Sequence, residues 1–258
     1  MMVTLAYFVL LLALAIGFAV RKGIFDRLPA LLSAFAWALL SAGLAQRGWE
    51  AGHWPIAGRY EFALCWVWAI LALSLLLVAD QGRVVHAYLS PWPLAAAALV
   101  FTYALAFPDA QKAIAPLSPV LRSPWLQIHV LSALLAYGAA AVAAGLAVER
   151  LLAHESPLER PALRMVAIGF TWLTLSILAG MVWAQGAWGR YWDWDIKEVW
   201  ALGTWLWYLF LLHAHPFLRR REQRLAWLII AGFALVSFTF AGVPWLVHLL
   251  RLETLHGY

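Results

Sequence analysis

Long apolar runs alternate with short polar segments along the whole chain. Each run approaches the roughly 20 residues that an α-helix needs to cross the hydrocarbon core of a bilayer. The pattern predicts about eight spans, at residues 3–20, 28–46, 61–79, 92–107, 126–150, 165–184, 198–216 and 225–248. Strands of a membrane barrel would instead alternate in polarity over about ten residues. The predicted fold is an all-α polytopic membrane protein, with one integral membrane domain over residues 1–258.

Composition and charge support a membrane environment. Hydrophobic residues make up 65% of the 258 residues and charged residues 12%, about half of the roughly 25% that soluble domains carry. The net charge of +5 would suggest a nucleic-acid partner for a soluble protein. Here the basic residues lie in the segments between spans, as membrane topology requires. We therefore expect contact with membrane lipid and none with nucleic acid.

The positions of arginine and lysine predict the orientation of the chain. No positive charge precedes the first apolar run, and Arg21 and Lys22 follow it directly, unlike the order in a cleavable signal peptide. With the N-terminus outside, eleven of the 18 basic residues fall in inside segments and seven outside. The distribution favours placing both termini, and the functional face, on the extracytoplasmic side.

Cysteine chemistry contributes little to this chain. Cys65 is its one cysteine and lies in the third predicted span. A single thiol cannot carry out dithiol–disulfide exchange, and the sequence lacks the C-x-x-C-H pattern that attaches haem covalently. We therefore expect neither a thiol-redox transporter nor a c-type cytochrome.

The segment 183–207, between the sixth and seventh predicted spans, differs from the rest of the chain. Its tryptophans are Trp183, Trp188, Trp192, Trp194, Trp200, Trp205 and Trp207. An aromatic belt at the membrane interface explains one or two tryptophans at each helix end. It does not explain why glycines (Gly186, Gly189) and acids (Asp193, Asp195, Glu198) are interleaved with them. The mixture favours an apolar platform that a flat ligand can approach closely, with the belt as the alternative.

A porphyrin has the properties that such a platform suits. Its large planar face matches indole rings, and Arg190 or Lys197 could pair with its two propionates. Haem iron is commonly held by imidazole. His129, at the outer start of the fifth span, and His256, in the C-terminal tail, fall on the predicted side of the tryptophan segment. They are candidate iron ligands, with two interfacial histidines as the alternative.

Another histidine, His213, lies inside the seventh predicted span, with His215 two residues later. Ionisable groups within a membrane are costly and usually functional. His213 could ligate a second, membrane-embedded haem, yet the chain offers no equally convincing intramembrane partner, so a partner subunit could supply one. The remaining histidines, interpreted mainly as surface or interface residues, are His53, His86, His154 and His248.

Four segments resemble the cytochrome c assembly family. The most specific is WAQGAWGRYWDWDIKEVWALGTWLWYLFLLHAH, from Trp183, which is similar to the tryptophan-rich WWD signature of that family. Weaker likenesses are GHWPIAGRYEFALCWVW from Gly52, SPWLQIHVLSALLAYGA from Ser123 and the C-terminal LHGY. Within the family the chain most resembles the CcsA, or ResC, branch of the two-component cytochrome c synthesis system. The likeness runs in order from about residue 50.

The resemblance implies a set of sites and partners. His129 and His256 would ligate the outer haem, and His213 a membrane haem whose second histidine belongs to a CcsB/ResB-like subunit. The haem b would be bound non-covalently, as a substrate, and presented to an apocytochrome c with a C-x-x-C-H motif for thioether formation. The site residues implied are Trp183, Trp188, Gly189, Arg190, Trp192, Trp194, Asp195, Lys197 and Glu198. The expected location is a bacterial plasma membrane or a thylakoid-type membrane.

Some positions depart from the family pattern, and other functions stay open. Ile196 stands where the family has a proline, His215 where it has an arginine and Phe62 where it has a serine. Glu61 matches the acid of the family.

Within the family, the alternative functions are those of a CcmC-like protein that delivers haem to a chaperone and of a haem-biosynthesis regulator of the HemX type. Outside it, they are a membrane solute transporter and a b-type electron-transfer cytochrome.

Overall fold

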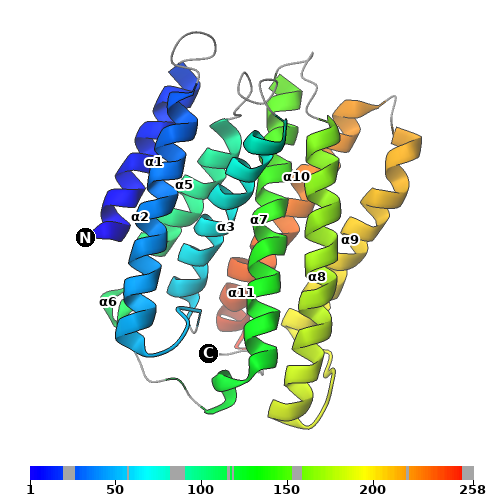
Figure 1. The fold of residues 1–258 in the computed structure, drawn as a ribbon. Coiled ribbons are helices and arrows are strands. Elements are labelled where there is room, and N and C mark those ends of the chain that lie inside the picture. The colour runs from blue at the N-terminus through cyan, green and yellow to red at the C-terminus, as the bar shows by residue number, and fades with distance from the viewer. Residues whose placement is uncertain are drawn as a thin grey trace. The chain divides into compact units, whose positions relative to one another are not determined.

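The computed structural model describes residues 1–19, 27–56, 58–81, 91–114, 117, 119–152, 159–218 and 221–251. Helices dominate these described residues and no strand occurs among them, which confirms the all-α prediction. The chain divides into two compact units, Met1–Leu117 and Ser118–Tyr258, and Figure 1 colours them in chain order from blue to red. The predicted single domain over residues 1–258 stays a prediction.

Among the described residues, the first unit contains three helices of 18 to 24 residues and the 15-residue α5. Its elements are α1 (Met2–Ala19), α2 (Leu28–Ala51), α3 (Arg59–Gln81), α5 (Pro91–Leu105) and the short α6 (Asp109–Lys112). Both α1 and α3 pack on α2 and on α5, so the four form a closed arrangement (Figure 1). Between helices, the Trp68 Nε1 donates to Ser41 Oγ over 2.8 Å, and the Tyr7 and Thr102 hydroxyls lie 2.9 Å apart.

The second unit is organised around α7. Its elements are η1 (Pro119–Arg122), α7 (Pro124–Leu152), α8 (Glu159–Trp188), α9 (Ile196–Leu218), α10 (Glu222–Ser237), the π-helical turn η2 (Phe238–Gly242) and α11 (Val243–Leu250). Helix α7 packs on α8 and α10, and α9 packs on the same two helices. In Figure 1 the start of α7 and the α8–α9 connection lie at the same end of this unit, and α11 runs toward that end.

Small residues bring α7 and α8 close together. Gly169, Leu173, Ser176 and Gly180 follow one another at intervals of four, three and four residues, so they share one face of α8. A Cβ atom added at Gly169 would lie 3.3 Å from the carbonyl oxygen of Ala136 on α7. Membrane helices use such small residues to let their backbones approach. The close contact determines where α7 places His129.

The predicted spans agree with the helices of the structure. Within the described residues, each of the eight predicted apolar segments is helical over most of its length, and six helical stretches are long and apolar enough to cross a membrane. The other two segments correspond to α5, an apolar helix of 15 residues, and α9, whose first turn contains Lys197 and Glu198. The chain is an all-α polytopic membrane protein. The extracytoplasmic placement of both termini stays a prediction.

Candidate functional site

The tryptophan-rich segment folds as a short connection between two helices. Helix α8 ends at Trp188 because Gly189 adopts a left-handed conformation, with a φ of 76°, and its N–H donates to the Gln185 carbonyl over 3.0 Å. Glycine is favoured at this position after a helix because it has no Cβ to clash. We name residues 189–195 the tryptophan loop.

Two acids fix the far end of the tryptophan loop. Asp195 precedes α9, and its Oδ1 accepts the Lys197 N–H over 2.9 Å. Three residues later, Glu198 Oε2 accepts the N–H of Asp195 over 3.3 Å and that of Asp193 over 2.8 Å. The bond from the Asp195 N–H to Glu198 is one half of a capping box, whereas the Asp195 side chain accepts from Lys197, the second residue of α9. This arrangement satisfies N–H groups that the start of a helix otherwise leaves without partners.

The tryptophans at this end form two edge-to-face pairs. The Trp183 and Trp188 ring centroids lie 5.9 Å apart with an interplanar angle of 79°, and those of Trp192 and Trp194 lie 5.9 Å apart at 84°. The buried Trp183 donates its Nε1–H to the Val120 carbonyl over 3.1 Å. In contrast, the buried Nε1–H groups of Trp188 and Trp192 have no acceptor within the described residues.

The other three tryptophans of the segment pack within the helix bundle. Trp200 packs against Phe238 of η2 with 4.6 Å between ring centroids and an interplanar angle of 54°. Trp205 donates to Thr174 Oγ1 over 2.8 Å, and Trp207 donates to the Leu228 carbonyl over 3.0 Å. These indoles hold α9 against α8 and α10. The predicted segment 183–207 therefore combines a loop surface with a structural helix face.

The middle of the tryptophan loop is exposed. Arg190 and Asp193 form an ion pair through Nη1 and Oδ1, with side chains 58% and 31% exposed. Trp194 has a φ of 58° and is 70% exposed, and Tyr191 is 55% exposed. Among the described non-glycine residues only Trp194 and Arg251 have a positive φ. Such backbone strain is enriched at ligand-binding sites.

His129 has the surroundings of a ligand with a defined tautomer. Its Nδ1 lies 2.7 Å from the carbonyl oxygen of Ser176 on α8. A carbonyl only accepts, so Nδ1 carries the proton and the lone pair is on Nε2. A Cβ atom added at Gly180 would lie 2.7 Å from Nδ1, so the missing side chain of Gly180 makes room for the ring. Metal-binding histidines usually donate their second ring N–H in this way.

The other candidate iron ligands lie elsewhere. His213 is on an exposed face of α9, and its Nδ1 donates to the Leu209 carbonyl over 2.8 Å, which also leaves the lone pair on Nε2. Along α9, His213 is about 26 Å from Ile196, whereas Gly180 is about 12 Å from Trp188 along α8, at a rise of about 1.5 Å per residue. His213 therefore lies in the other half of the second unit from the tryptophan loop. His256 lies outside the described residues.

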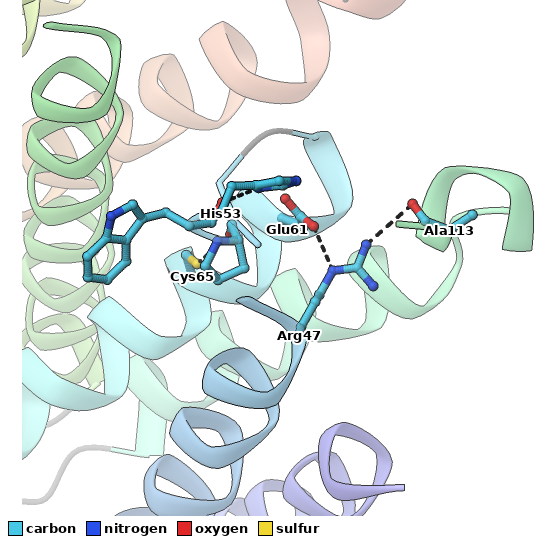
Figure 2. A network of polar contacts seen from close by, with 7 residues as sticks. Arg47, His53, Glu61, Cys65 and Ala113 are labelled. Carbon is cyan, nitrogen blue, oxygen red and sulfur yellow. Dashed lines mark hydrogen bonds and ion pairs between the residues drawn. The ribbon is translucent and has the colours of Figure 1, made fainter. Parts of the chain in front are cut away.

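A separate polar cluster lies at one end of the first unit (Figure 2). Arg47 of α2 donates its Nε–H to Glu61 Oε1 over 2.6 Å, and its Nη2 lies 3.5 Å from the Ala113 carbonyl. Both side chains are largely buried, 17% exposed for Arg47 and 6% for Glu61. The Cys65 thiol donates to the Pro55 carbonyl over 3.3 Å. This cluster joins α2, α3 and the residue that follows α6.

Sequence reasoning missed Ser176 and Gly180. Besides its carbonyl, Ser176 contacts His129 through Oγ, which lies 3.0 Å from the His129 carbonyl and 3.2 Å from Nδ1. The two residues form a small-x-x-x-small pair, SILAG, on an apolar helix. That spacing indicates close helix packing in membranes and was the available signal. It does not indicate which residue of another helix lies opposite.

Comparison with known proteins places the chain in a family. The model of the cytochrome C assembly protein family matches residues 56–250. Cytochrome c biogenesis protein CcsA of Parasynechococcus marenigrum (strain WH8102) is 32% identical over 279 residues, which cover 92% of this chain and 90% of that protein. The CcsA protein of Chlamydomonas reinhardtii is 29% identical over 245 residues, covering 90% and 68%.

A solved structure adds a likeness of fold. Cytochrome c heme lyase CcmF aligns with 94% of this chain at a TM-score of 0.68 and 19% identity, and the chain spans 48% of that protein. The family match covers well over half of the chain, and it includes α3, the start of α7, the tryptophan loop and α9. The chain therefore belongs to the cytochrome c assembly protein family.

Proposed function

We propose that this protein binds haem b non-covalently, as a substrate, and presents it to an apocytochrome c for covalent attachment. The observation that carries the proposal is the packing of His129. The Ser176 carbonyl accepts its Nδ1–H, which leaves the lone pair on Nε2. The absence of a side chain at Gly180 leaves room for the ring against α8. The tryptophan loop belongs to the same end of the second unit (Figure 1). Two similar proteins, a cytochrome c biogenesis protein and a heme lyase, support the same activity by their names.

The residues of this end have complementary roles in the proposal. Trp188, Trp192 and Trp194 cover the porphyrin, and Arg190 pairs with a propionate. His129 ligates the iron, with His256 as the second ligand from the C-terminal tail. The protein supplies orientation and exclusion of water, whereas the thioether chemistry uses the vinyl groups of haem and the thiols of the C-x-x-C-H motif. This end of the unit and both termini face the extracytoplasmic side of a bacterial plasma membrane or a thylakoid-type membrane.

His213 belongs to a second step of the proposal. Its Nδ1–H is held by its own helix and its side chain is exposed on α9. It ligates a membrane haem together with a histidine of a CcsB/ResB-like subunit. In protein made with that partner, His213→Ala should reduce haem occupancy severalfold while the unfolding midpoint in detergent stays unchanged. Full haem occupancy of the variant would contradict this role.

The main test combines spectroscopy with an attachment assay. Purified protein should give a pyridine haemochrome signal and a low-spin Soret spectrum. His129→Ala should weaken or convert that spectrum and abolish haem attachment to a co-expressed C-x-x-C-H reporter. The matched control is His248→Ala, because His248 is an exposed histidine on α11. An unchanged spectrum and normal attachment in His129→Ala would contradict the proposed function.

A further inference from the structure

The tryptophan loop places a large aromatic residue in an unfavourable backbone conformation. Trp194 has a φ of 58°, a region that residues with a Cβ seldom adopt. Its indole is nonetheless 70% exposed, so burial of the ring in the described structure does not offset the strain. Some other interaction must hold the backbone of this residue in place.

Glu198 supplies that interaction. Its Oε2 accepts the N–H of Asp193 over 2.8 Å and the N–H of Asp195 over 3.3 Å, which are the N–H groups of the residues before and after Trp194. One carboxylate oxygen therefore bridges the chain across the strained residue. Glu198 itself is in the first turn of α9, a helix of 23 residues that packs on α8 and α10. Its position is thus set by a rigid element.

We propose that Glu198 is a positioning residue that holds Trp194 in its left-handed conformation and so presents the indole face to the ligand. The inference rests on the proposed function for the identity of that ligand, the haem substrate. It assigns Glu198 a role different from direct contact with haem, which the sequence suggested. Hydrogen bonds from peptide N–H groups to a carboxylate are among the stronger ones in proteins, which suits a residue that must oppose strain.

The first experiment tests the loop without haem. Arg190 lies four residues before Trp194, and cleavage after it by trypsin reports how readily the loop opens. Limited proteolysis of the full haem-free protein is compared for wild type, Glu198→Gln and Glu198→Ala, with cleavage after Lys112 in the first unit as the internal reference. We expect cleavage after Arg190 to become about tenfold faster in Glu198→Ala and to stay within about twofold in Glu198→Gln, whose side-chain oxygen still accepts both bonds. Equal rates in all three proteins would overturn the proposal.

The second experiment asks whether Glu198 acts through Trp194. Haem affinity, measured by Soret titration, is compared for Glu198→Ala, Trp194→Ala and the double variant. Each single change should weaken binding about tenfold, and the double variant should be no weaker than either, because both remove the same contact. A loss of about a hundredfold in the double variant would show independent contributions and overturn the proposal. If wild type binds no haem, the proposed function fails, and the proteolysis arm alone decides the positioning role.

Discussion

The two units carry contrasting polar clusters at their helix ends. In the first unit, Arg47 and Glu61 are largely buried, and the pair is extended by a contact to the Ala113 carbonyl (Figure 2). In the second unit, the Arg190–Asp193 pair is exposed, and beside it lies Trp194 with a positive φ. The first cluster uses its polar groups within the protein. The second leaves polar and aromatic groups available to another molecule.

The difference teaches how to separate a structural cluster from a binding surface. A buried charge without a partner is expensive, so removing either member of the Arg47–Glu61 pair should destabilise the packed helices. A native protein seldom leaves buried polar atoms without partners, and each exception needs an explanation. The Nε1–H groups of Trp188 and Trp192 are such exceptions within the described residues. Because the buried Nε1–H of Trp37 in the first unit is another such exception, the second cluster is distinguished by the exposure of the Arg190–Asp193 pair and of Trp194.

The largest effect on stability is expected in the first cluster. Glu61→Ala leaves Arg47 without its carboxylate in a site where that guanidinium is only 17% exposed. Removing one partner of a buried pair costs about 3 kcal/mol, which an SDS titration of the purified protein would measure as a lower unfolding free energy. Asp109→Asn is the control, since Asp109 pairs with Lys112 while 102% exposed, and it should leave stability unchanged. Equal effects of the two substitutions would refute the structural role of the buried pair.

The next largest effect is expected for Gly180→Ala. This change should alter the haem spectrum and leave the first unit unaffected. The new Cβ would lie 2.7 Å from His129 Nδ1, so the ring must move away from the Ser176 carbonyl. Overpacking of this kind costs roughly 1–3 kcal/mol. The low-spin Soret spectrum should shift toward a high-spin form. Gly17→Ala is the control, because its Cβ would meet Pro91 at an ordinary 3.5 Å. A native spectrum in Gly180→Ala would exclude a tightly held His129.

Sequence patterns predicted the helices well because apolar runs of bilayer length specify them locally. They also predicted that the tryptophan loop separates the sixth and seventh spans. The contact between His129 and the Ser176 carbonyl could not be predicted from these patterns. Ser176 is 47 residues away, and the contact depends on how α7 packs against α8. Glu198 is a different case, because the sequence allows two interpretations of it. Its acid in an aromatic segment suggested contact with haem, whereas D-x-x-E before a helix is also the pattern of a capping box.

Two glycines beside the tryptophan loop should respond to alanine with opposite signs. Gly189 has a φ of 76°, where a Cβ is unfavourable, so Gly189→Ala should lower the unfolding free energy by about 1 kcal/mol. Gly186 lies within α8, and a Cβ there would meet nothing within 4 Å. Gly186→Ala should therefore raise stability by up to about 1 kcal/mol through helix propensity. The SDS titration measures both, and a shared sign would contradict the end of α8 at Trp188.

The smallest effect on stability, and the most informative one for binding, is expected at the Arg190–Asp193 pair. With side chains 58% and 31% exposed, the pair contributes little to folding, so Arg190→Gln and Asp193→Asn should both unfold like the wild type. Their effects on haem affinity should nevertheless be opposite, because in the proposed site Asp193 and a propionate would compete for the same guanidinium. Arg190→Gln should weaken binding severalfold, whereas Asp193→Asn should leave it unchanged or tighten it.

Soret titrations at two salt concentrations add a second criterion, since only the proteins that keep Arg190 should lose affinity as salt screens the propionate contact. If both variants weaken binding equally, the intact ion pair shapes the loop as a structural unit, and the contrast with Arg47 and Glu61 disappears.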